Sequence, residues 1–105
     1  MVRLMVLVSP PRHLGLDEAE DWLRDEVAPL AGAAGVRSGA LSRLGSASRR
    51  WCPEWGWLIE LHFDDVQTAR ETVADDAWAL LLGDLRLLGM RPTVALIEGA
   101  QELGR

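Results

Sequence analysis

Hydrophobic residues follow two different spacings along the chain, and the changes between them mark the predicted elements. Residues 2–8 alternate between two largely apolar sides, which predicts a strand that is covered on both faces of a sheet. Apolar residues then recur at helical spacing from Leu16 to Ala34, which predicts a helix that Pro29 kinks or restarts. The acidic residues in the first turns of this helix are expected to form a solvated face that favours its N-terminus.

The rest of the chain alternates in the same way. Glu60 and His62 lie on one side of an extended segment whose other side is fully apolar, as in a strand with one buried face. Asp64 and Asp65 come directly before the next helical pattern and are expected to cap it. The further predicted ranges are a strand at 36–44, a loop at 45–56, a strand at 57–63, a helix at 66–74, one or two helical turns at 76–82 and a strand at 93–97.

This order of elements predicts a ferredoxin-like α+β fold. The βαββαβ order gives a four-stranded antiparallel sheet with helices on one face, and 105 residues suit one domain spanning positions 1–105. Two helices cover only one face of such a sheet, yet the predicted strands carry apolar residues on both sides. The second face therefore needs a partner, and a second copy of the chain is the simplest candidate.

Charge and residue usage narrow the candidate partners and chemistry. A net charge of -5 argues against a nucleic-acid partner, and no apolar run reaches the roughly 20 residues that cross a bilayer, so no membrane partner is expected and the cytoplasm is the expected location. All eleven basic residues are arginine, which excludes a Schiff-base lysine. Cys52 has no second cysteine to pair with, and the two histidines lack the spacing of a metal pair, so no metal is expected.

Glu60 and His62 are the candidate catalytic residues. They are two positions apart on a predicted strand, so both point away from the helices, towards a cleft or a dimer seam. A histidine beside a carboxylate in apolar surroundings suits general acid or base catalysis, because its pKa is close to neutral pH. The alternative is a buried polar contact across the dimer interface.

Five further residues are candidates for substrate binding, each with a structural alternative. Arg3 and Arg43 lie on strands and could reach a carboxylate or enolate oxygen, or instead extend their side chains to the sheet edge. His13 lies in a turn that could form the mouth of a site, or is an exposed loop histidine. Trp51 and Trp55 lie in the 45–56 loop and could cover an apolar ligand or pack against a partner subunit.

Three stretches resemble the EthD-like family of the dimeric α+β barrel superfamily. Residues 22–30 (WLRDEVAPL) are similar to a family helix motif that leads into a His-Ala-Pro-Leu step, with Val27 where the histidine is usual. Residues 60–65 (ELHFDD) resemble the end of the family's third strand, and residues 79–97 continue the likeness through a leucine-rich helix into the last strand.

The resemblance implies a homodimer whose two sheets meet face to face. Relatives of this shape include cofactor-free monooxygenases and polyketide cyclases, so the resemblance favours an accessory enzyme that binds a hydrophobic aromatic or polyketide-like metabolite and uses acid–base chemistry without a cofactor. The valine at position 27 argues against a mechanism built on the usual histidine there. The alternative is a dimer that binds a metabolite or serves a structural role without catalysis.

Overall fold

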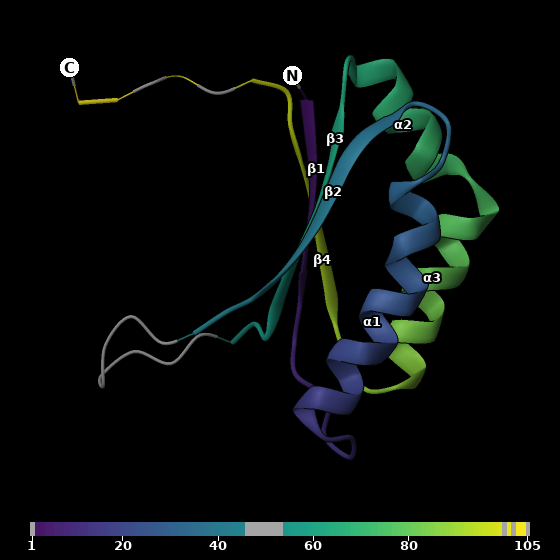
Figure 1. The fold of residues 1–105 in the computed structure, drawn as a ribbon, viewed down its shortest axis with the longest axis vertical. Coiled ribbons are helices and arrows are strands. Elements are labelled where there is room, and N and C mark those ends of the chain that lie inside the picture. Colours follow the sequence, from purple (N-terminus) through teal and green to yellow (C-terminus); the bar gives the residue numbers. More distant parts are fainter. Residues whose placement is uncertain (1, 46–53, 100, 102, 105) are drawn as a thin grey trace.

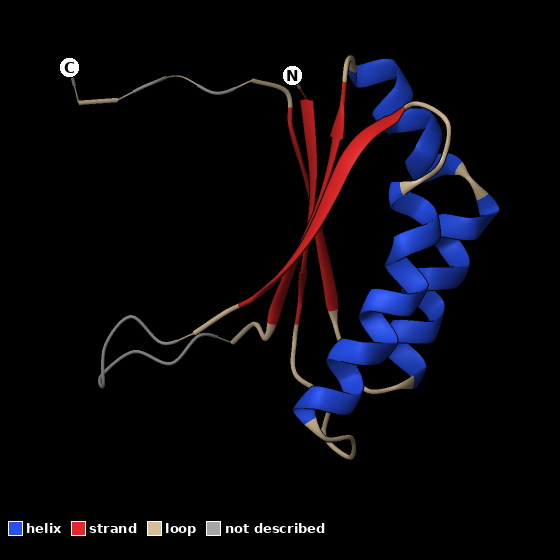
Figure 2. Ribbon diagram, in the orientation of Figure 1, coloured by secondary structure: helices blue, strands red, loops and turns tan. Residues whose placement is uncertain are grey.

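One four-stranded sheet carries a single layer of helices on one of its faces (Figures 1 and 2). The computed structural model describes residues 2–45, 54–99, 101 and 103–104. In chain order the elements are β1 (Val2–Val8), α1 (Leu16–Ala31), β2 (Val36–Arg43), β3 (Trp57–Phe63), α2 (Val66–Ala74), α3 (Asp76–Leu87) and β4 (Pro92–Ile97).

The strand order β2-β3-β1-β4 confirms the predicted ferredoxin-like fold. Every neighbouring pair is antiparallel, and β1 lies between β3 and β4. Strand β1 is central, as its apolar character predicts, but the helices cover only one of its faces. The expectation that both faces are covered is therefore wrong for the single chain, in which Arg3, Met5 and Leu7 on the other face are half-buried. Across the sheet, Arg3 is opposite His62, and Val8 is opposite Trp57 at the other end of the two strands.

The core lies between the sheet and the helices. Alternate residues of β1 and β3 are buried and face the helix layer, as the alternating pattern predicts. Side chains from the three helices meet them there. The largest buried side chains of this core are Trp57, Trp78, Phe63, Leu4, Leu23, Ile59, Leu61, Leu85 and Met90.

Two predicted helix ends were wrong. Helix α1 ends at Ala31 and not at Ala34. It continues through Pro29, and Gly32 follows as its C-terminal cap, whose backbone N–H donates to the carbonyl oxygen of Ala28. Helix α3 continues past the predicted end at residue 82 to Leu87. The interior Gly83 does not end it, since Leu81 and Leu85 on either side are buried on the same helix face.

Candidate functional site

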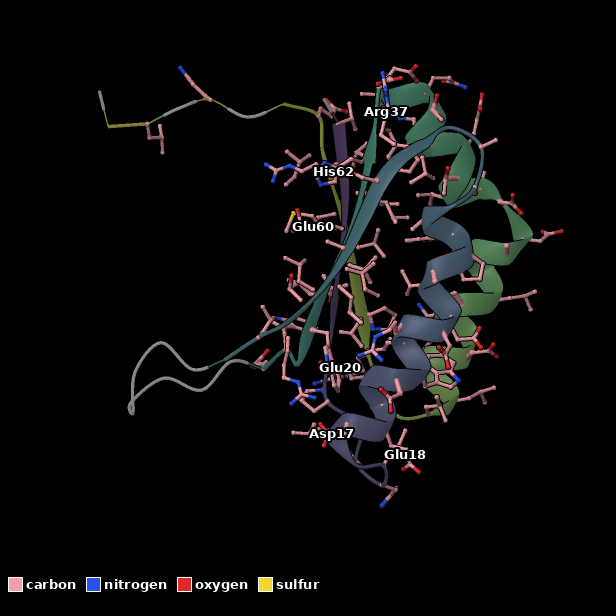
Figure 3. All side chains as sticks on the ribbon, viewed as in Figure 1. Asp17, Glu18, Glu20, Arg37, Glu60 and His62 are labelled. Atoms are coloured by element: carbon pink, nitrogen blue, oxygen red, sulfur yellow. The ribbon has the colours of Figure 1, made fainter. Side chains whose placement is uncertain are left out.

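The sheet face opposite the helices is open and carries the two predicted catalytic residues. In Figure 3 Glu60 and His62 project from the side of the sheet that the helices do not cover. Strand alternation and the pairing register place a polar and an apolar part on this face. Its members are Arg3, Met5 and Leu7 of β1, Ser38, Ala40 and Ser42 of β2, Leu58, Glu60 and His62 of β3, and Thr93, Ala95 and Ile97 of β4.

The polar part is a cluster of Arg3, Glu60 and His62. A guanidinium nitrogen of Arg3 lies 3.6 Å from Oε2 of Glu60, and Nε2 of His62 lies 3.9 Å from the same oxygen. The side chains of Glu60 and His62 are 21% and 29% exposed, so both are sheltered yet within reach of a ligand. One carboxylate oxygen therefore faces a guanidinium and an imidazole at once.

This arrangement suits proton transfer next to an apolar surface. The carboxylate of Glu60 favours one orientation of the His62 ring, and Arg3 supplies a positive charge that can pair with an anion. Met5 is paired with Glu60 across the sheet, and Leu58 is two residues before it, so apolar side chains adjoin the cluster. The face thus combines an acid–base pair, a cation and an apolar platform.

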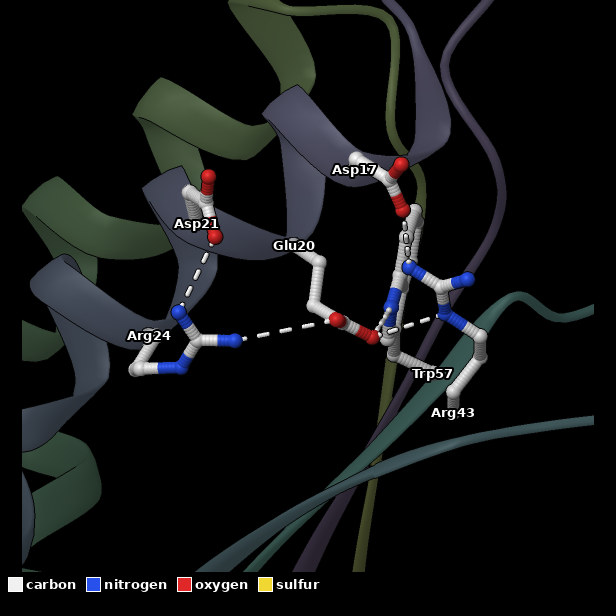
Figure 4. A network of polar contacts seen from close by, with 6 residues as sticks. All are labelled: Asp17, Glu20, Asp21, Arg24, Arg43 and Trp57. Atoms are coloured by element: carbon white, nitrogen blue, oxygen red, sulfur yellow. Dashed lines mark hydrogen bonds and ion pairs between the residues drawn. The ribbon is translucent and has the colours of Figure 1, made fainter.

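A second polar network lies at the other end of the sheet, on the helix side (Figure 4). Arg43 at the end of β2 donates from Nε to Glu20 at 2.8 Å and from Nη2 to Asp17 at 2.8 Å. The indole N–H of Trp57 donates to the same Glu20 oxygen at 3.0 Å. Arg24 lies 3.7 Å from the other oxygen of Glu20. The network connects α1 to β2 and β3.

The hydrogen bonds of this network stabilise the charged forms of Glu20 and Arg43. The hydrogen bond from Arg43, followed by that from Trp57, lowers the pKa of Glu20 from its ordinary value of 4.5. The bonds to Asp17 and then Glu20 raise the pKa of Arg43 further. Both carboxylates come from an acidic run that was expected to form a solvated face. That holds for Asp17, whose side chain is 94% exposed although it pairs with Arg43, and is wrong for Glu20, whose side chain is 23% exposed.

Glu20→Gln is expected to weaken folding at neutral pH, because the depressed pKa of Glu20 adds stability that is present above 4.5. That contribution is lost as the pH falls through the folded-state pKa, so the difference from wild type should shrink in acid. The effect is modest, since the Arg43 side chain is 46% exposed and solvent screens the pair. Urea denaturation over a pH series measures it. Glu18→Gln on the same helix turn is the control, and an equal loss in both variants would contradict the assignment.

Arg43 and Trp55 line a pocket beside this network. The pocket has a volume of about 220 Å³ and lies where the start of α1 faces the connection between β2 and β3. Its lining residues are Pro10, Leu16, Arg43, Leu44, Trp55, Gly56 and Trp57. Arg43 already pairs with two carboxylates of its own chain. Its predicted contact with a ligand stays a prediction.

The predicted site residues thus fall into two groups at opposite ends of the sheet. Arg3, Glu60 and His62 are together at one end of the open face. Arg43 and Trp55 are at the other end, on the helix side, and the exposed His13 is in the loop that leaves β1 at that end. Trp51 and Cys52 lie outside the described residues.

Two absences hold for the described part of the chain. It contains no group of three or more histidine, cysteine, aspartate or glutamate side chains that could hold a metal ion. None of its helices has the length and apolar character needed to cross a membrane.

Comparison with known proteins extends the structural picture. No protein-family model matches the sequence, and no curated protein matches it significantly. Among solved structures, an EthD family protein from Bacillus halodurans superposes with a TM-score of 0.68 at 20% identity, covering 95% of this chain and 99% of its own. SnoaB from Streptomyces nogalater, a cofactor-independent oxygenase, superposes with a TM-score of 0.67 at 18% identity, covering 99% of this chain and 97% of its own.

A third structure has a described assembly. A dimeric protein of unknown function with a ferredoxin-like fold, from Bacteroides fragilis, superposes with a TM-score of 0.68 at 11% identity, covering 93% of this chain and 95% of its own. At these identities the likeness concerns the fold. The resemblance to the EthD-like dimeric α+β barrels is confirmed at that level, over nearly the whole chain.

Proposed function

We propose that this chain forms a homodimer through its open sheet face and binds an apolar aromatic or polyketide-like molecule there. His62 then exchanges a proton with the molecule, and no cofactor takes part. The observation that carries the proposal is the Arg3–Glu60–His62 cluster on a face that also offers Met5 and Leu58. A catalytic cluster in a sheltered, partly apolar setting is a common arrangement for acid–base work.

The chemistry assigns one role to each member of the cluster. Neutral His62, whose Nε2 faces Glu60, accepts a proton at Nδ1 from a phenolic O–H or an acidic C–H of the ligand, and Glu60 stabilises the imidazolium that results. The ligand is left as a phenolate or enolate, whose charge the guanidinium of Arg3 offsets. Returning the proton to the ligand restores the neutral histidine.

The structural neighbours support this reading of the fold. SnoaB, which shares the fold, is a cofactor-independent oxygenase, and the Bacteroides fragilis protein is dimeric. A dimer also accounts for the apolar side chains on the open face, since a second sheet packed on it removes them from water. Enolate formation is a step that both cyclisation and oxygenation of such ligands require.

A hydroxylated anthrone in deuterated buffer provides the test, because its ring CH2 is acidic and its exchange is visible by NMR. Wild-type protein is expected to accelerate the exchange, and His62→Gln to lower the rate by about 10²- to 10⁴-fold while native mass spectrometry still shows two chains. His13→Gln, which removes the only other histidine, is expected to cost less than His62→Gln. An oxygen electrode reports whether the anion goes on to react with oxygen.

Two results would contradict the proposal. Equal exchange in wild type and His62→Gln would remove His62 from the reaction. Binding of the anthrone without any accelerated exchange would favour the alternative, a dimer that binds a metabolite without catalysis.

A further inference from the structure

The outward side of α3 carries an apolar stripe formed by Leu80, Gly83 and Leu87, whose two leucines are largely exposed to solvent. Leu80 is 67% exposed and Leu87 is 85% exposed, whereas leucines on helices normally face the core. The stripe is directly opposite the buried side of the helix, where Trp78, Leu81 and Leu85 pack. It borders a shallow depression of about 760 Å³ lined by Asp76, Ala79, Leu80, Gly83, Asp84 and Leu87.

Gly83 at the centre of the stripe is unexplained by the chain's own packing. Glycine inside a helix destabilises it relative to alanine, so a reason for it is expected. Its φ is not positive, and a Cβ placed there would meet no atom within 4 Å. The space beside Gly83 is therefore not filled by the chain itself, and the absence of a side chain there allows a second helix to approach closely.

The pattern is complementary to itself when two copies of α3 run antiparallel. Placing Leu80 of one copy over Gly83 of the other makes the second copy's Leu80 fill the first copy's Gly83, as a two-fold axis requires. The same register brings Asp76 near the end of the helix that carries Leu87 and Arg86. Among the described residues neither Asp76 nor Arg86 has an ion-pair partner, so the two would pair across the axis on both sides.

We propose that the outward face of α3 is a second self-association surface, where two copies of the chain pair through antiparallel α3 helices. It is on the opposite side of the molecule from the open sheet face (Figure 3), so both surfaces can be used at once and join two sheet-paired dimers. One 12-residue helix pair forms a small interface. The association is therefore weaker than sheet pairing and depends on concentration.

Sedimentation of the wild-type protein over a wide concentration range is expected to show two chains passing to four. Leu80→Ser and Gly83→Leu should both stop at two chains. Gly83→Leu should also melt at a higher temperature, because it replaces a glycine inside a helix and its Cβ meets no atom within 4 Å. Leu103→Ser removes a leucine outside α3 that is even more exposed than Leu80, 86% against 67%, and should associate like wild type.

Charge exchange tests the proposed register. Asp76→Arg and Arg86→Asp should each weaken the association, and the double variant should restore it. The sheet-face variant Leu58→Asp distinguishes this surface from the other, since it should still pair through α3 at high concentration even if sheet pairing is lost.

Three outcomes would overturn the proposal. The first is wild-type protein that never exceeds two chains at any concentration, and the second is Gly83→Leu associating like wild type. The third is Leu80-dependent binding to phosphatidylcholine vesicles without self-association, which would assign the stripe to a membrane surface instead.

Discussion

Leu58→Asp is expected to turn the proposed homodimer into folded monomers at protein concentrations too low for pairing through α3. Leu58 is half-buried on the open sheet face, opposite Leu7 on one side and Ser42 on the other. In a single chain the new carboxylate remains in contact with water, so the fold tolerates it. Between two packed sheets it would be buried without a partner at a cost of several kcal/mol, which raises the dissociation constant by more than about a hundredfold.

The measurement is the molecular mass in solution, by sedimentation or light scattering, with circular dichroism to confirm that the variant is folded. Leu103→Asp is the matched control, since Leu103 is 86% exposed and lies outside the sheet. Its mass should equal that of wild type. Retention of the wild-type mass by Leu58→Asp would show that the open sheet face is not where the copies meet.

The face on which each strand residue lies could be predicted because strand geometry repeats every two residues. That rule alone placed Glu60 and His62 on the side away from the helices, where the structure has them. The proximity of Arg3 to this pair was not predicted, because it depends on the register between β1 and β3. Arg3 and the opposite His62 are separated by 58 intervening residues, and local spacing does not encode a register between segments so far apart in the chain.

The Glu20–Arg43–Trp57 network shows a second limit of the sequence. Glu20 is on a helix and its partners are on two strands, 23 and 37 positions away. A helical acidic run is usually solvated, so composition favoured the wrong interpretation of this residue. Arg43 and Trp57 are paired across β2 and β3, and only the assembled sheet brings both to one carboxylate. The length of α3 was missed for a related reason, since the buried face that extends it past Gly83 is defined by tertiary packing.

Trp57→Ala is expected to be the most destabilising single substitution discussed for this chain. The side chain is 1% exposed and is among the largest in the core, so its removal leaves a cavity under the sheet. Truncating a buried tryptophan to alanine costs about 3–5 kcal/mol, a large part of the roughly 5–15 kcal/mol that stabilises a domain. Urea denaturation at one fixed protein concentration measures the loss, because self-association would otherwise shift the midpoint.

Trp57→Phe and Trp78→Phe separate packing from hydrogen bonding in this effect. Both tryptophans are buried, but the Trp57 indole donates to Glu20, whereas within the described residues Nε1 of Trp78 has no partner. Phenylalanine at position 57 leaves the Glu20 oxygen with one donor fewer, while at position 78 it removes a buried N–H that made no bond. Trp57→Phe should therefore cost more than Trp78→Phe. Equal losses would mean that Trp57 stabilises the fold through its volume alone, and that its bond to α1 contributes nothing measurable.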